Sequence, residues 1–163
     1  MNNNAALNKT GAGTLLLNGS KTGTGALTVS TGVLGGIGTI AGTVTNLATI
    51  TAADTNSIGT LTLTNLVMAS NSTNIWNCNA VTQDVINVTG TLTLPSVATV
   101  IVNEDMVGDI GLKPRTLFTF TTGPASGRLP NWVVIGADER TAVRVEGKLV
   151  TLFRLGGTLI RVM

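Results

Sequence analysis

The chain has 163 residues, enough for one domain with a buried core, and carries a net charge of only +2. Charged residues make up 11%, against roughly a quarter in an average soluble domain, and there is no His. These numbers exclude catalytic triads and zinc sites that use His, and the single cysteine, Cys78, excludes an internal disulfide and a zinc site made of thiolates alone.

The charge and hydropathy patterns argue against two further classes of partner. No basic run is interleaved with aromatic residues, so a nucleic-acid partner is not expected. No run of about 18 uninterrupted apolar residues occurs, and a helical membrane span is not expected either. The opening sequence MNNNAALNKTG lacks the basic and apolar regions of a signal peptide, so the chain is either exported by an upstream segment or not exported.

Residues 1–103 have the composition of short β-strands separated by sharp turns. Thr is frequent and favours strands, Gly and Asn favour turns, and strong helix formers never cluster over the length of a helix. Gly-Thr followed by a branched aliphatic residue recurs, and the distances from Gly13 to Gly32 and from Gly42 to Gly59 are 19 and 17 residues. The sequence thus predicts an all-β fold of repeated strands and glycine corners.

The shortage of charge in this region distinguishes between two all-β architectures. A sandwich or up-and-down barrel joins antiparallel strands by hairpins and has outer faces rich in Lys and Glu. A parallel β-solenoid stacks each coil about 4.8 Å above the last, so that identical charges would repel while Thr, Ser and Asn form ladders. The charged residues favour a solenoid of about five coils, because the first 103 residues contain only Lys9, Lys21, Asp54 and Asp84.

The opening stretch LNKTGAGTLLLNGSKTGTGALTVSTGVL, residues 7–34, resembles the autotransporter-associated β-strand repeat, and weaker similarity extends to about residue 102. The pattern of that family is roughly Leu-x-Lys-x-Gly-x-Gly-Thr-Leu-x-Leu-x-Gly, followed by a glycine-rich turn, a strand and Gly-x-Leu. The aromatic residue often found in the turn is absent here, where the sequence reads SKTGTG. The matching positions are Leu7, Lys9, Gly11, Gly13, Thr14, Leu15, Leu17, Gly19, Gly32 and Leu34.

The resemblance implies a right-handed parallel β-helix in a secreted or surface-displayed bacterial protein. Such regions serve as stalk or passenger scaffold and carry no catalytic residues. Glycine allows the backbone to turn sharply, and the predicted structural corners are Gly11, Gly13, Gly19 and Gly32. Alternate residues of a strand face the core, and the predicted core residues are Leu15, Leu17 and Leu34.

Residues 104–163 differ from the first part in charge and aromatic content. They contain fourteen charged residues and all three Phe, and they read as five alternating strands, RTLFTFTTG, NWVVIG, TAVRVEG, KLVTLFRL and GTLIRVM. Within them, VEGKLV predicts a hairpin through Gly147-Lys148. Because the last coil of a solenoid exposes unpaired backbone groups and core side chains, we interpret 104–163 as a β-rich C-terminal cap packed on the coils of 1–103.

Catalytic and metal-binding patterns are sparse. Polysaccharide lyases and hydrolases built on parallel β-helices need clustered carboxylates on one face, and the first 103 residues contain only two acids. One of them, Asp84, is interpreted as a corner residue. The acidic group of Glu104, Asp105 and Asp109 is interpreted as a solvated loop rather than a calcium site. We therefore expect no enzymatic activity, no cofactor and no bound metal.

These observations lead to one expected function and two alternatives. The expected function is a non-enzymatic scaffold or stalk segment at the bacterial cell surface or outside the cell. The open end of its first coil would contact upstream coils of the same protein or a neighbouring identical subunit, and in the second case the chain would assemble into an extracellular fibre. The other alternative is an adhesin or glycan-binding module, in which Trp76 and Trp132 would contact a sugar or a partner.

Overall fold

Two sheets contain all the strands of the computed structural model, which describes residues 4–104 and 113–156. The larger, sheet A, has ten strands, and the smaller, sheet B, has six. No helix long and apolar enough to cross a bilayer occurs in this part of the chain. The prediction of an all-β fold is confirmed for the described residues.

The strands are short, and along the chain the strands of sheet A are interleaved with those of sheet B. Sheet A contains β1 (Leu7–Lys9), β3 (Ser20–Lys21), β4 (Leu27–Val29), β6 (Thr39–Asn46), β8 (Thr60–Met68), β10 (Val85–Thr93), β12 (Arg115–Thr122), β13 (Gly127–Arg128), β15 (Thr141–Glu146) and β16 (Leu149–Arg154). Sheet B contains β2 (Thr14–Leu16), β5 (Val33–Gly35), β7 (Thr49–Thr51), β9 (Thr73–Cys78), β11 (Ala98–Glu104) and β14 (Trp132–Ile135).

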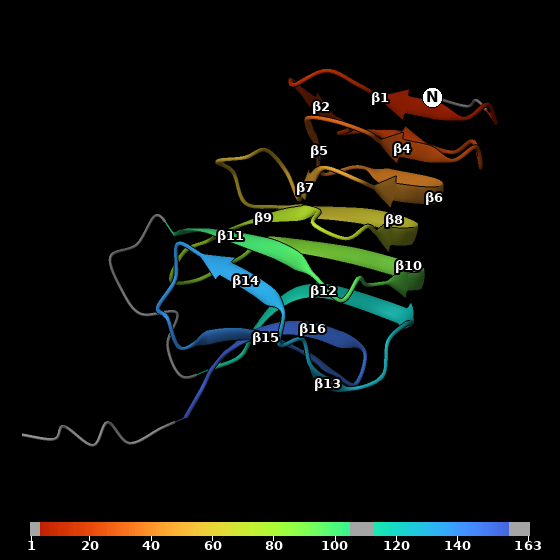
Figure 1. Ribbon diagram of the computed structural model, residues 1–163. Helices are drawn as coiled ribbons and strands as arrows, with labels where there is room; N and C mark the ends of the chain where they lie inside the picture. Colours follow the sequence, from red (N-terminus) through yellow and green to blue (C-terminus); the bar gives the residue numbers. More distant parts are fainter. Residues whose placement is uncertain (1–3, 105–112, 157–163) are drawn as a thin grey trace, which may run out of the picture.

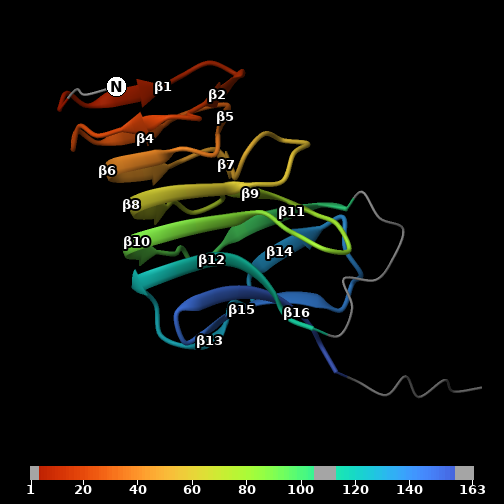
Figure 2. The same ribbon diagram turned by 180° about the vertical axis from the view of Figure 1, so that it is seen from behind.

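Successive strands of each sheet are parallel over most of the chain. Sheet A runs β1-β4-β6-β8-β10-β12, with β3 also paired to β6, and sheet B runs β2-β5-β7-β9-β11-β14. Every pairing in these two series is parallel. Figures 1 and 2 show from two sides the resulting stack of coils, in which one coil is one passage from sheet A through sheet B and back. The arrangement is β-solenoid-like, as predicted, and differs from an antiparallel sandwich.

Equivalent positions on successive coils are separated by unequal lengths of chain. In sheet A the stacked positions are Leu7, Leu27, Val44, Leu66 and Leu92, which gives circuits of 20, 17, 22 and 26 residues. The strands keep their register while the corners between them vary in length. A strictly periodic sequence is therefore not needed for this stack, and the imperfect repeat of the sequence has a structural reason.

The two glycine spacings seen in the sequence have different meanings. The distance from Gly13 to Gly32 corresponds to one coil, because the residues that follow them, Thr14 and Val33, are direct partners. The distance from Gly42 to Gly59 does not, because Thr43, which follows Gly42, is the partner of Asn65 and not of Thr60. The loop of residues 52–59 lengthens that circuit and places Gly59 at a different corner.

In two long strands of sheet A, β6 and β10, the pairing register shifts beside a glycine. In β6 the pairing with β8 shifts between Ile40 and Thr43, and Gly42 between them has a φ of 88°. In β10 the pairing with β8 shifts between Val88 and Leu92, on either side of Gly90. A local bulge of this kind bends a strand and is stabilised where a residue without a side chain can adopt the required backbone angles. Each of these strands thereby contributes to two faces of its coil.

The core is a column of aliphatic side chains that runs along the stack. Alternate residues of each strand point inward, and the inward positions are almost all Leu, Ile or Val. The fully buried members of sheet A include Leu27, Val29, Ile40, Val44, Leu61, Leu63, Leu66, Ile86, Val88 and Leu92. Those of sheet B include Leu34, Ile50, Trp76, Ala98 and Val100. Burial of this continuous apolar surface supplies the main driving force for folding.

Strand direction changes at the end of sheet A that follows β12. There β12 pairs with β16, β16 with β15 and β15 with β13, all antiparallel. The predicted hairpin through Gly147-Lys148 is confirmed, because Glu146 and Leu149 are direct partners and Gly147 has a φ of 60°. The parallel ladder itself continues past residue 103 into β12 and β14, so the change in charge does not coincide with the change in strand direction. The predicted strand over 157–163 lies outside the described residues.

A pair of adjacent residues in β8 tests the inward and outward alternation. Leu63 is fully buried in the core and Thr64 is exposed. We expect Leu63→Ala to lower the free energy of unfolding by about 2–5 kcal/mol, because it removes buried methyl groups and leaves a cavity. Thr64→Ala, the matched control, should change it by about 1 kcal/mol or less. Urea unfolding followed by tryptophan fluorescence measures both, and equal losses would contradict the placement of this strand.

Candidate functional site

The glycines predicted as corners fall into two groups. Gly11 and Gly32 have φ angles of 79° and 75°, which residues other than glycine rarely adopt. A Cβ on Gly32 would also collide with the carbonyl oxygens of Gly11 and Gly13 from the coil above. Gly13 and Gly19 do not have positive φ angles, and nothing lies within 4 Å of a Cβ built on either. The backbone thus requires glycine at Gly11 and Gly32.

The first coil, residues 7–21, covers its core side chains only partly. Leu34 in the second coil is fully buried, whereas Leu15 and Leu17 are half-buried and pack against the core from one side. In the described residues β1, β2 and β3 each pair with one strand only, β4, β5 and β6 respectively. An open groove of about 250 Å³, lined by residues 16–21, lies at the same end. The first coil therefore presents strand edges and apolar side chains that another coil could cover.

Both tryptophans are buried. Trp76 is 1% exposed, and its indole N–H donates to the carbonyl oxygens of Asp84 and Thr116 at 2.8 and 3.2 Å. Trp132 is 6% exposed, and its indole N–H donates to the carbonyl oxygen of Pro95 at 3.0 Å. Stacking on a sugar requires an exposed ring face. Neither indole offers one, because both side chains point into the core.

Lys21 is a buried cation that the sequence did not reveal. Its side chain is held at a corner of the first coil, where Nζ donates to the carbonyl oxygens of Gly23 and Gly25 at 2.6 and 2.7 Å. The carbonyl oxygen of Ala41, in the next coil, lies 3.4 Å away. Three acceptors match the three donors of an ammonium group, so Lys21 closes the glycine-rich turn and ties it to the coil below.

Asp84 is a buried carboxylate that joins residues from several coils. It is 1% exposed and lies just before β10. Its Oδ1 accepts the backbone N–H of Gly59 at 2.8 Å, and its Oδ2 accepts the backbone N–H and the side-chain amide of Asn77 at 3.0 and 2.7 Å. The Thr51 hydroxyl lies 3.5 Å from Oδ2. The carboxylate is thus surrounded by hydrogen-bond donors, as a buried charge requires.

Two stacked asparagines extend this network to the loop of residues 52–59. Asn77 and Asn103 are direct partners on β9 and β11, and the amide of Asn103 donates to Oδ1 of Asn77 at 3.2 Å. The amide of Asn77 also donates to the carbonyl oxygens of Asp54 and Ser57, both at 3.1 Å. That of Asn103 donates to the carbonyl oxygen of Thr55 at 2.9 Å. Sequence reasoning missed both asparagines, although their separation of 26 residues equals one circuit at this height.

A small polar cavity lies between the loop and these strands. It measures about 40 Å³ and is lined by Asn56, Ile58, Asn77, Cys78 and Asn103. A volume of this size holds a few water molecules at most and is too small for a sugar ring. The cavity therefore belongs to the architecture of the corner rather than to a ligand site.

Burial raises the pKa of Asp84 from 3.8 to about 6, and the hydrogen bonds from Asn77, Gly59 and Thr51 oppose this rise. A perturbed carboxyl pKa is a common sign of a functional site. Here, however, the carboxylate is inaccessible and its oxygens already accept hydrogen bonds from the protein. The arrangement is suited to fixing a corner of the fold, and general acid or base chemistry would need access for a substrate.

No group of three His, Cys, Asp or Glu side chains among the described residues is close enough to hold a metal ion. Of the acidic group named from the sequence, Asp105 and Asp109 and the side chain of Glu104 lie outside the described residues. Cys78 is buried beside the small cavity, as expected for a small apolar residue in a core.

No protein-family model matches this chain, and no curated protein matches it in sequence. The resemblance of residues 7–34 to the autotransporter-associated repeat therefore stays a prediction.

The two predicted corner glycines Gly32 and Gly13 provide a matched pair. Gly32→Ala should lower the free energy of unfolding by more than about 1–2 kcal/mol, because alanine is strained at positive φ and its Cβ collides with the backbone above. Gly13→Ala should be close to neutral, since its Cβ meets open space. Urea unfolding at neutral pH measures both variants. A tolerated Gly32→Ala would show that this corner is built differently.

The raised pKa of Asp84 predicts how stability changes with pH. Because the folded pKa of about 6 exceeds the ordinary value of 3.8, the folded protein holds a proton that the unfolded chain releases between these values. The contribution of Asp84 to the free energy of unfolding is therefore largest below about pH 4. It decreases by at most about 3 kcal/mol as the pH rises to about 6. Unfolding free energies at pH 4, 5, 6 and 7 should therefore slope more steeply downward for the parent protein than for Asp84→Asn. Parallel profiles would contradict this role.

Proposed function

We propose that this chain is a non-enzymatic scaffold or stalk segment of a bacterial protein that is displayed at the cell surface or secreted. In this proposal the coils form a right-handed parallel β-helix, and the antiparallel strands β16, β15 and β13 form its C-terminal cap. The observation that carries it is the continuous parallel ladder of both sheets around one aliphatic core. Such a ladder makes a stiff rod, since every coil is hydrogen-bonded to the coils beside it.

The nature of the buried polar groups supports a structural role. The polar side chains at the corners of the coils are already hydrogen-bonded to backbone or side-chain groups of the protein. This holds for Asp84, Asn77 and Lys21. Residues used in this way hold neighbouring coils together and have little capacity left for a ligand. The resemblance of residues 7–34 to a passenger repeat, together with this corner chemistry, favours a scaffold over an enzyme.

The exposed first coil supports a contact with a further coil at that end. Within the described residues, half-buried Leu15 and Leu17 and the outer edges of β1 and β2 would gain burial and hydrogen bonds from a coil stacked on them. We propose that upstream coils of the same protein, or a neighbouring identical subunit, supply it. Self-assembly into a fibre is the weaker form of this proposal, because head-to-tail growth needs two open ends and antiparallel strands lie at the other end of sheet A.

Analytical ultracentrifugation over a range of concentrations separates these forms of contact. A monomer, or a dimer that does not grow, fits one open end, whereas an open-ended series of oligomers would favour the fibre.

The proposal of a non-enzymatic chain is tested by incubation with pectin-like and alginate-like polymers. Cleavage that is lost in Asp84→Asn would overturn it.

Limited proteolysis with trypsin tests the stiffness of the stack. Lys21 is 4% exposed and bonded at its corner, so cleavage after it should be slow in the folded protein. Arg128, which is exposed on the short strand β13, should be cut much earlier. Mass spectrometry of the fragments gives the order of cleavage, and digestion in urea is the control in which Lys21 becomes accessible. Early cleavage after Lys21 in the folded protein would argue against a rigid stack.

A further inference from the structure

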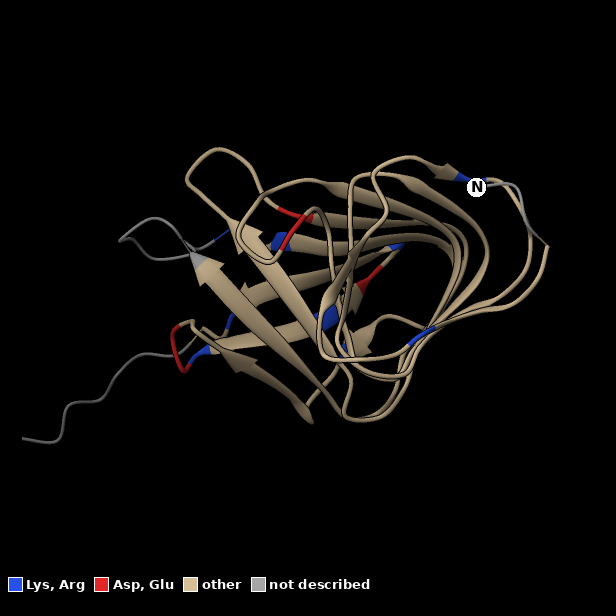
Figure 3. Cartoon of the chain, turned by 90° about the horizontal axis from the view of Figure 1, so that it is seen from above, with Lys and Arg blue, Asp and Glu red and all other residues tan. Residues whose placement is uncertain are grey.

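Positive charge is concentrated at one end of the molecule. Residues 4–104 contain two basic and three acidic residues, whereas residues 113–156 contain seven basic and three acidic ones. The net charge of the two segments is therefore −1 and +4. Figure 3, which looks along the stack, colours the backbone blue at Lys and Arg and red at Asp and Glu. The seven basic residues of the second segment are Lys113, Arg115, Arg128, Arg140, Arg144, Lys148 and Arg154.

Two of these arginines lie directly opposite each other. Arg128 on β13 and Arg144 on β15 are antiparallel partners, so their side chains leave the same face of sheet A. Like charges in this position repel each other, and they are destabilising unless an anion lies between them. No ion pair or side-chain hydrogen bond joins Arg128 to any residue in the described part of the chain.

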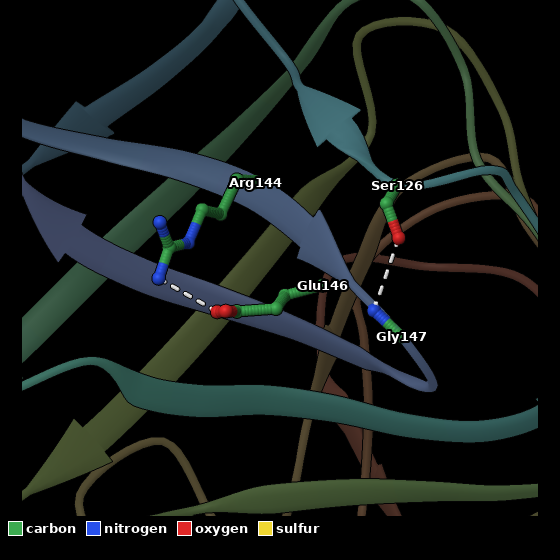
Figure 4. A network of polar contacts seen from close by, with 4 residues as sticks. All are labelled: Ser126, Arg144, Glu146 and Gly147. Atoms are coloured by element: carbon green, nitrogen blue, oxygen red, sulfur yellow. Dashed lines mark hydrogen bonds and ion pairs between the residues drawn. The ribbon is translucent and has the colours of Figure 1, made fainter.

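The guanidinium of Arg144 is held in place from two sides. Its Nη2 lies 2.6 Å from Oε2 of Glu146, as Figure 4 shows, and its Cζ lies 4.7 Å from the centre of the Phe153 ring. A guanidinium stacked on an aromatic ring keeps its planar set of N–H donors in a fixed orientation. The backbone beside it is also fixed, since Gly147 N–H donates to the Ser126 hydroxyl at 3.1 Å.

One nitrogen of this guanidinium and one hydroxyl on the neighbouring strand have no hydrogen-bond partner within the described part of the chain. They are Nε of Arg144 and Oγ1 of Thr151, both buried, and the two residues are direct partners on β15 and β16. Thr151 is 3% exposed. Buried donors are almost always satisfied in folded proteins, so two unsatisfied ones on neighbouring residues indicate a missing partner such as water or an ion.

We infer that Arg128, Arg144 and Thr151 form a binding site for an oxyanion, that is, a phosphate, sulfate or carboxylate group. The anion would lie between the two guanidinium groups, which match the geometry of such oxygens. Nε of Arg144 and the Thr151 hydroxyl would supply the inner donors. Because both atoms are covered in the unbound arrangement, the anion must displace the Glu146 carboxylate, while the Arg144 guanidinium stays stacked on Phe153.

Glu146 acts in this site as the competitor of the ligand. Its carboxylate already occupies one N–H group of Arg144, at the position that an external carboxylate or phosphate would prefer. Removing its charge should therefore strengthen binding. This site does not depend on the proposed scaffold role, since it uses residues of the antiparallel strands and none of the corner network.

Isothermal titration calorimetry with inorganic phosphate tests the site in the full chain. We expect saturable binding that is weakened about tenfold by Arg128→Gln and several-fold by Thr151→Val, and strengthened by Glu146→Gln. Arg154→Gln is the matched control, because it removes one positive charge from the same sheet at a position that is ion-paired with Asp138 at 3.0 Å. It should change the affinity by less than about twofold.

Two readouts keep the test independent of folding. Circular dichroism checks that each variant keeps its β-structure, and the Nε–H resonance of Arg144 in a ¹⁵N spectrum should shift as phosphate is added. Absence of binding, an unchanged affinity in Arg128→Gln or Thr151→Val, or an equal loss in Arg154→Gln would overturn the site.

The source of the oxyanion is distinguished by a second set of ligands. Polygalacturonate presents carboxylates along a polymer, and dextran is a matched polymer without charge. Binding of polygalacturonate that is lost in Arg128→Gln would assign the site to an acidic polysaccharide. Binding of inorganic phosphate alone would assign it to a small anion.

Discussion

The register of the parallel strands is the constraint on which this structure depends. Strands of a sheet lie about 4.8 Å apart, so each side chain has its counterpart from the previous coil directly above it. Leu27, Val44 and Leu66 are stacked in this way inside, and Thr28 and Thr45 outside. Most inward positions are therefore apolar on successive coils, and outward positions must tolerate a near-identical neighbour. Uncharged Thr and Asn satisfy that condition, which explains why charge is rare along the parallel ladder.

Those features that follow from local chemistry could be predicted from the sequence. The shortage of charge and the recurring Gly-Thr pattern indicated parallel stacking, and VEGKLV indicated the hairpin at Gly147-Lys148, because turn geometry depends on a few adjacent residues. The lengths of the circuits could not be predicted. They depend on how much chain each corner holds, and the loop of residues 52–59 is fixed by asparagines that come from later coils.

The buried polar network shows the same limit. Asp84 was interpreted as a corner residue, but its partners Gly59 and Asn77 lie 25 and 7 residues away in the chain, and only folding brings them together. The burial of the two tryptophans could not be predicted either. An indole in a strand has the same sequence signature whether it faces solvent or core, and the structure places both Trp76 and Trp132 inside, where their N–H groups bond to carbonyl oxygens.

The unequal circuits have a consequence for what the fold can accommodate. The shortest and longest circuits differ by nine residues and the strands still keep their alignment, so added chain is absorbed at the corners. The turn after β9 is such a place, because Val81 within it is 91% exposed. Val81 lies outside both strands of the parallel ladder, so chain added beside it would extend the turn rather than interrupt a strand.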